Sequence, residues 1–341
     1  MKIIKKKEVL LSIIAMAFLV NCTEPKSLVY TKRPLQGKDA LFKFQIESGN
    51  NYPGVALRSS SADQRAPDIS PDKSKVAYHG QGSSGLESIF IANINTNEAP
   101  VELASSSRGH LEYPKWSLSN LNSRIAVRCE GYNEATQIKT GSDAICVIDA
   151  ATGEIRQVTA PRTDHAVIQG HDFIGDQHII FSRTTREGLK ALYLYDFEAQ
   201  TEKELLKSPG YDLTEPAATT DANGNIHVAF IREKISTGEK SISVTVLTAS
   251  QTLTEAGGSP YSRPNLESTA IDESKLRFES LAFDTNHVDL YISAEAVSVD
   301  CPQGPSRNYE LFKVIFTNGQ TTWNRISSSC TDDFRPAIIP R

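Results

Sequence analysis

A short segment made of an apolar residue, a turn and a β-prone run recurs along this chain, and the repeat limits the possible folds more than any other feature. Its clearest copy is "ISPDKSKVAY" (residues 69–78), where proline fixes φ and the serine and aspartate side chains can bond nearby backbone. After a glycine-rich loop, "SIFIANI" (residues 88–94) alternates apolar and polar residues as a strand does, and "VEL" (residues 101–103) is a further short strand. Four antiparallel strands of this kind form one blade of a β-propeller.

Four further copies of the unit follow, in residues 113–127, 171–182, 215–230 and 279–293. A sixth copy, "FRPAIIP" (residues 334–340), contains only an innermost strand, whereas the N-terminal runs "SLVYTK", "ALFKFQI" and "GVALRS" have no innermost strand before them. We expect these two fragments to pair, because closing the ring removes an unpaired strand edge. The predicted fold is therefore all-β, a six-bladed β-propeller closed by pairing of the C-terminal strand with N-terminal strands. Seven blades also fit the length.

The repeat resembles the WD40-like repeat of the TolB-like six-bladed β-propeller family, written as proline, two residues, Ser-Pro-Asp-Gly and a strand. Ser70-Pro71-Asp72 is similar to this signature, with Lys73 where glycine is usual, and the resemblance covers about residues 27–341. It implies a propeller that binds another protein in the cell envelope. It also resembles the propeller of some peptidases, but only their non-catalytic half.

The N-terminal segment has the form of a bacterial signal peptide. Four lysines lie within the first eight residues, and the apolar run "VLLSIIAMAFLV" (residues 9–20) is too short to span a bilayer as a helix. Cys22 follows, with Leu19 three positions before it, and resembles the lipidated cysteine of bacterial lipoproteins. Asn21 departs from the small residue that usually precedes that cysteine, so the alternative is a plain secretory signal with a free cysteine.

These features predict three segments: a lipoprotein signal peptide at residues 1–21, a lipidated tether at 22–27 and a single β-propeller domain at 28–341. The predicted location is the bacterial cell envelope, where the lipid would anchor the protein to the outer membrane on either its periplasmic or its surface face. The chain is acidic, with a net charge of −5, and has no basic cluster beyond its first eight residues. Nucleic acid is therefore not a predicted partner, because phosphate binding needs concentrated positive charge.

The other four cysteines form an even set in a chain with an export signal, which favours disulfides. Cys129 and Cys146 lie in two strand-like runs joined by a loop, so antiparallel pairing would bring them face to face. Cys301 and Cys330 bracket the last long repeat in the same way. We predict two disulfides, with four free thiols as the alternative.

The candidate site follows from the fold, because the segments just before the innermost strands of a propeller meet around one mouth of its central channel. Charged and imidazole side chains occupy these positions, and they suit a peptide or another polar ligand. An alternative is that they only solvate the rim and cap strand ends. The predicted partner-binding residues are Arg65, His110, Glu112, His171 (with His165 as an alternative), Glu215, Glu279, Asp333 and Arg335.

The predicted function is therefore a non-enzymatic, lipid-anchored envelope protein that binds a protein or peptide partner, within the envelope or outside the cell. The sequence has no Gly-x-Ser-x-Gly elbow, and its seven histidines lack the spacing of common metal motifs, so no catalytic residue, metal or cofactor is predicted. The alternative is a lyase or lactonase acting on a saccharide or lactone in the channel, with Glu112 and Glu215 as acid and base.

Overall fold

The computed structural model describes residues 27–33, 38–45, 55–57, 63–96, 98–106, 109–118, 123–133, 136, 138–160, 162–220, 226–247, 278–283, 289–297, 307–317, 320–327 and 332–339. Three predicted modification positions, Cys22, Cys301 and Cys330, lie outside these residues, as does the whole predicted signal peptide. In the described part, no helix is long and apolar enough to cross a membrane.

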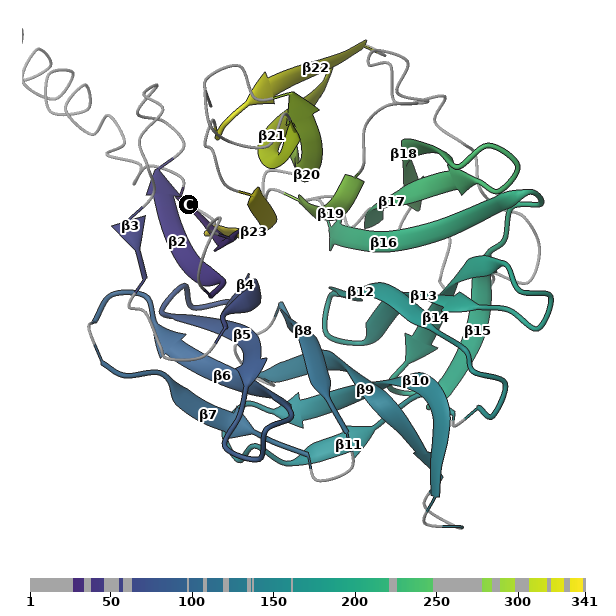
Figure 1. Ribbon diagram of the computed structural model, residues 1–341. Helices are drawn as coiled ribbons and strands as arrows, with labels where there is room; N and C mark the ends of the chain where they lie inside the picture. Colours follow the sequence, from purple (N-terminus) through teal and green to yellow (C-terminus); the bar gives the residue numbers. More distant parts are fainter. Residues whose placement is uncertain are drawn as a thin grey trace, which may run out of the picture.

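Strands account for the architecture, and within the described residues they form six sheets that radiate around a common centre (Figure 1). From the centre outwards, blade 1 contains β23 (Asp332–Ile339), β1 (Ser27–Arg33), β2 (Ala40–Gln45) and β3 (Val55–Ala56); blade 2 contains β4 (Arg65–Ile69), β5 (Lys75–Gln81), β6 (Glu87–Asn93) and β7 (Val101–Ala104); and blade 3 contains β8 (Leu111–Trp116), β9 (Arg124–Asn133), β10 (Ile138–Asp149) and β11 (Ile155–Gln157).

The remaining three sheets continue in the same order around the ring. Blade 4 contains β12 (Ile168–Ile174), β13 (His178–Thr184), β14 (Lys190–Asp196) and β15 (Thr201–Leu206); blade 5 contains β16 (Tyr211–Thr220), β17 (Ile226–Lys234) and β18 (Glu239–Leu247); and blade 6 contains β19 (Phe278–Phe283), β20 (Asp289–Val297), β21 (Arg307–Thr317) and β22 (Gln320–Arg325). The prediction of a six-bladed propeller is confirmed, and the seven-bladed alternative is wrong.

The ring closes as predicted, through pairing of the last strand with the first. Strand β23 is antiparallel to β1, with Ser27 opposite Ile339 and Arg33 opposite Asp332, and it forms the innermost strand of blade 1. In Figure 1 this strand lies near β2, towards the centre of the ring. Blade 1 is thus assembled from both ends of the described chain.

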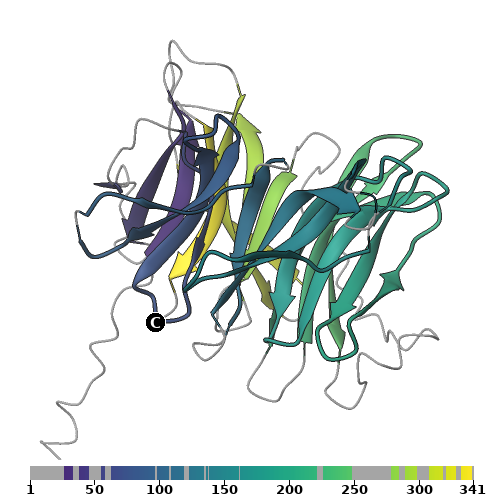
Figure 2. The ribbon, with the colours of Figure 1, turned by 90° about the horizontal axis from the view of Figure 1, so that it is seen from below.

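The hydrophobic core is divided into layers between neighbouring blades, whose faces pack against each other in the edge-on view of Figure 2. One cluster joins Ala77 and Ile89 of blade 2 to Trp116 and Ile125 of blade 3, all of them buried. Similar clusters occupy each of the other five junctions, including the one between blades 6 and 1. Each blade therefore depends on both of its neighbours for burial of its apolar side chains.

The Ser-Pro-Asp turn that marked the repeat ends β4 and reverses the chain into β5. Ser70 Oγ donates to Asp72 Oδ1 at 2.6 Å and accepts from the Lys75 backbone N–H at 2.9 Å, so the serine joins both ends of the turn. Lys73 has a φ of 61°, in the left-handed region. This conformation is the physical reason that glycine is favoured at this position of the family signature.

Candidate binding site at the channel mouth

Each innermost strand carries a β-bulge near the channel mouth at which it begins. The strand register shifts within β4, β8, β12, β16, β19 and β23, so one extra residue is inserted in each strand. At five of these bulges a residue has a positive φ; they are Ala66, Tyr113, Gly170, Glu215 and Arg335. The equivalent position in blade 6 is Glu279, between the register positions of Phe278 and Ser280. Equivalent positions of the six blades thus surround one opening, and residues of five different types occupy them.

The bulges are stabilised by the sequence and by neighbouring blades. Four of the five positive-φ residues are non-glycine, and each of these four precedes a proline, which has no N–H to leave unpaired. The N–H of Tyr113 donates to His79 Nδ1 at 3.1 Å, and that of Arg335 donates to Ser280 Oγ at 3.1 Å. These bonds link consecutive blades and hold the bulged residues in place.

Tyr113 is the centre of an aromatic and cationic cluster. The Arg128 guanidinium lies 4.6 Å and the Arg335 guanidinium 4.2 Å from the centre of its ring, and the His79 ring meets it edge-on at 5.0 Å. Arg335 belongs to blade 1 and Tyr113 to blade 3, so the contact reaches past blade 2 within the channel (Figure 1). Burial lowers the pKa of His79 well below its usual value, and nearby arginines add to the effect. The imidazole is therefore neutral, as its role as acceptor requires.

Arg65 forms the second charged cluster of the mouth. Its guanidinium contacts Asp39 at 2.8 Å, Asp63 at 3.0 Å and Glu87 at 3.7 Å, and Asp39 also binds Arg33 at 2.9 Å. Asp39 is 4% exposed, and these two arginines are its cationic partners. Predicted site residue Arg65 thus lies at the mouth, where it joins blades 1 and 2.

Further along the channel, Lys115 of β8 lies between carboxylates from other blades. Its ammonium is 3.9 Å from Asp68 Oδ1. Burial by itself would lower the pKa of Lys115, but Asp68, Asp172 and Glu215 together outweigh burial and raise it. Asp68 accepts a hydrogen bond from the Trp116 N–H at 2.6 Å, and Asp172 accepts one from the Ala218 N–H at 2.9 Å. Burial raises the pKa of Asp68 to about 6, an effect that Lys115 opposes and Asp172 reinforces.

A pH dependence of stability follows from this raised pKa. Between the ordinary pKa of 3.8 and about 6, folded Asp68 keeps a proton that the unfolded chain has lost, so the free energy of unfolding falls as pH rises through this range. We expect Asp68→Asn to gain on the order of 1 kcal/mol of stability relative to wild type between pH 4 and 7. This is less than the full pKa shift implies, because the Asp68 side chain is 21% exposed. Urea unfolding at several pH values measures this difference.

The matched control is Asp164→Asn, which removes an exposed carboxylate whose pKa is lowered by Arg162. Because the folded pKa of Asp164 lies below the ordinary 3.8, its carboxylate is ionised in both states above this range, and the stability difference from wild type should change little between pH 4 and 7. Parallel plots of unfolding free energy against pH for wild type and Asp68→Asn would contradict the raised pKa of Asp68.

The structure does not place all the predicted site residues at the open mouth. His171 is 2% exposed and its Nε2 lies 3.2 Å from the Ala126 carbonyl oxygen, between blades 3 and 4. Burial lowers its pKa to about 3. Asp333 is 1% exposed, and its carbonyl oxygen accepts from Ser293 Oγ at 3.2 Å. These two residues hold blades together, whereas Glu112 pairs with Arg128 at the mouth and Glu215 lies beside Gly170.

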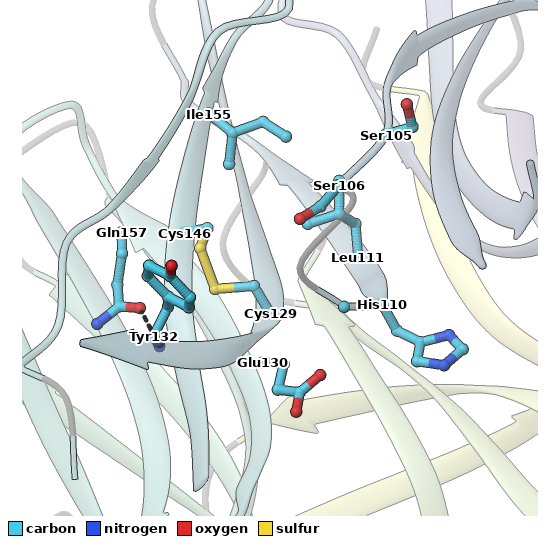
Figure 3. A pocket seen from close by; sticks show the side chains of 11 residues that line it. Ser105, Ser106, His110, Leu111, Cys129, Glu130, Tyr132, Cys146, Ile155 and Gln157 are labelled. Atoms are coloured by element: carbon cyan, nitrogen blue, oxygen red, sulfur yellow. Dashed lines mark hydrogen bonds between the residues drawn. A yellow bond between two sulfur atoms is a disulfide. The ribbon is translucent and has the colours of Figure 1, made fainter. Parts of the chain in front are cut away.

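His110 lines a separate cavity of about 330 Å³ beside the mouth, between blades 2 and 3. Figure 3 shows the predicted Cys129–Cys146 disulfide on its wall, close to Tyr132 and Gln157. The disulfide prediction for this pair is confirmed, with the two Cα atoms 5.8 Å apart. Gln157 Oε1 accepts from the Tyr132 N–H at 2.9 Å, which fixes one side of the cavity. The exposed His110 ring accepts from the Glu87 N–H at 3.2 Å.

Sequence reasoning missed Tyr113, Arg128 and Lys115 as channel residues. Only the segments before the innermost strands were expected to line the mouth, whereas Tyr113 and Lys115 lie within the innermost strand β8, and Arg128 lies in β9, the second strand of the blade. The available signal was the residue before each strand proline, which is Tyr113 in the third blade and Arg335 in the first. In the described part of the chain, no three His, Cys, Asp or Glu side chains form a group suited to a metal ion.

Comparison with solved structures places this geometry among known propellers. TolB from Acinetobacter baumannii superposes with a TM-score of 0.61 at 17% identity, covering 93% of this chain and 67% of that chain. The fold is that of the TolB-like propellers. A putative TolB from Agrobacterium tumefaciens gives a TM-score of 0.57 at 12% identity, over 93% of this chain and all of that chain. No family model and no curated protein matches the sequence.

The TolB-like propeller is also similar to a part of some peptidases. A puromycin-hydrolyzing peptidase from Mycobacterium tuberculosis superposes with a TM-score of 0.50 at 12% identity. The match covers 89% of this chain but only 46% of the peptidase. At these identities the similarity is one of fold, which many unrelated functions share.

Proposed function

We propose that this TolB-like propeller is a non-enzymatic binding protein of the bacterial cell envelope, which holds a protein or peptide partner at the channel mouth. The observation that carries the proposal is the set of six bulges, which surround one opening with an aromatic ring and charges of both signs. A ring of such different residues can distinguish the order of the side chains of a peptide and the direction in which its chain binds.

The catalytic alternative has less support from the geometry. Glu112, one of its two candidate carboxylates, is joined to the Arg128 guanidinium, which also lies 3.9 Å from Asp143. A general acid must reach the leaving group of a substrate, whereas the Glu112 carboxylate is already bound to the Arg128 guanidinium. We therefore assign Glu112 to positioning Arg128 beside Tyr113.

For the location, we propose lipid anchoring through Cys22 after removal of residues 1–21. The lysine-rich start, the apolar run and the cysteine that follows support this proposal. The five residues that follow Cys22 would then tether the propeller to the membrane.

Site-specific crosslinking in intact cells tests the binding role. We expect a photoreactive residue in place of His110, which is exposed at the mouth, to give a discrete adduct with a partner. The same residue in place of Ala199, exposed in the turn between β14 and β15, is the matched control and should give none. Arg65→Ala should weaken the His110 adduct at least about tenfold, the effect of losing a central charged contact.

The melting temperature of the Arg65→Ala protein separates binding from folding. It should stay close to that of wild type, because Arg33 still neutralises Asp39. Equal adducts from positions 110 and 199, or none from either, would overturn the proposed binding role.

A further inference from the structure

The guanidinium groups of the channel mouth differ in their charge balance. Arg65 contacts three carboxylates, and Arg128 contacts two. Arg335 forms no ion pair within the part of the chain that the structure describes; its backbone N–H binds Ser280 and its guanidinium lies over Tyr113. A partly buried cation without an anionic partner is unfavourable, so this position favours an incoming anion.

The stacked geometry determines which part of Arg335 remains for a ligand. The Cζ of Arg335 lies over the ring of Tyr113, 4.2 Å from the ring centre, and the N–H donors of a guanidinium point outwards along its planar edge. This planar edge matches the two oxygens of a carboxylate, which can accept two parallel hydrogen bonds. Contact with the face of an aromatic ring does not provide the two acceptor oxygens of a carboxylate, so a carboxylate ligand can still bind these donors.

The platform beneath Arg335 is fixed before any ligand arrives. Tyr113 is held by its backbone bond to His79 and by the Arg128 guanidinium on its ring, and Arg128 is held in turn by Glu112. Because these side chains are already held in place, little conformational entropy is lost when a ligand binds, which favours tight binding of a small group. Lys115, the next cation along the channel, has its own carboxylate in Asp68.

We propose that Arg335, stacked on Tyr113, is a carboxylate-binding subsite, into which the partner inserts an acidic side chain or a chain terminus. The inference rests on the proposed function and names the chemistry that the partner presents. It assigns Arg335 the role of an anchor and Tyr113 that of a platform.

Peptides that differ in one group test the subsite directly on the purified chain from residue 23 onwards. The probes are acetyl-Gly-Glu-Gly-amide, its glutamine analogue, and acetyl-Gly-Gly-Gly with a free terminal carboxylate, each titrated by NMR. We expect at least one carboxylate peptide to bind about tenfold or more tightly than the glutamine peptide. Binding of the glutamate peptide alone identifies a side chain as the source, and binding of the free acid alone identifies a terminus. Equal binding of all three, or of none, overturns the subsite.

Variants then locate the effect. Arg335→Gln should abolish the preference for carboxylate, and Arg335→Lys should restore only part of it, because lysine lacks the planar fork. Tyr113→Leu removes the platform without altering the closing strand, so it remains informative if Arg335→Gln folds poorly. The control is Arg124→Gln, since Arg124 also lies 4.2 Å from an aromatic ring, that of Phe197, but starts β9 at the far end of the sheet. An unchanged preference in Arg335→Gln and Tyr113→Leu would overturn the assignment.

The two proposals fail in different ways. If the crosslink from position 110 persists in the Arg335→Gln protein at wild-type strength, the mouth binds a partner without this subsite, and the inference is wrong. If position 110 gives no adduct even in wild type, the proposed binding role itself is wrong.

Discussion

Deleting residues 332–341 is expected to abolish cooperative folding of the propeller. The deletion removes β23, so β1 loses one of its two neighbours, and the buried side chains of Ala337 and Ile338 are lost from the layers against blades 2 and 6. Opening both layers costs more than a typical net stability of about 5–15 kcal/mol can tolerate once the ladder of β1 is also lost. Loss of the sigmoidal denaturant transition, followed by tryptophan fluorescence and circular dichroism, is the expected result.

A circular permutant shows whether pairing alone is responsible. Ser27 lies opposite Ile339 in the antiparallel ladder, so residues 332–339 can be joined to residue 27 by an Asn-Gly turn, with residue 331 as the new C-terminus. This chain keeps β23 beside β1 as a hairpin, and we expect it to recover a cooperative transition. Deleting only residues 340 and 341 is the control and should leave stability unchanged. A wild-type transition in the full deletion would show that β23 does not hold the ring together.

Breaking the disulfide of blade 3 is the second large effect. Cys129 and Cys146 are 17 residues apart and bonded across β9 and β10, so the bond restricts a loop of the unfolded chain. Reduction should lower the free energy of unfolding by about 3 kcal/mol. Guanidinium unfolding with and without dithiothreitol measures it, in a Cys301→Ala and Cys330→Ala background from residue 23 onwards, so that the reductant acts on one pair.

The control for this experiment is the same chain with Cys129→Ala and Cys146→Ala added. It should lose at least as much stability, because both sulfurs are buried and their removal leaves space, and the reductant should not change it further. An oxidised chain that shows two free thiols, or a stability unaffected by reductant, would contradict the bond.

The sequence alone predicts the fold because a propeller is built from local units. Five of the six blades are formed by strands that follow one another along the chain, with turns such as Ser70-Pro71-Asp72 between them, so the count of units predicts the count of blades. Ring closure and the Cys129–Cys146 bond were predictable for related reasons: an incomplete blade at each end needs a partner, and neighbouring strands bring their cysteines together.

What only the tertiary structure decided is which side chains meet inside the channel. The alternation of a strand assigns residues to two faces, but each bulge shifts this alternation by one residue and turns positions such as Tyr113 and Arg335 into the channel. These two residues are more than 200 positions apart in sequence and lie in blades that are not neighbours. Their contact exists only because the ring closes, and the burial of Asp333 between blades 6 and 1 has the same origin. The burial of His171 comes instead from the packing of consecutive blades 3 and 4.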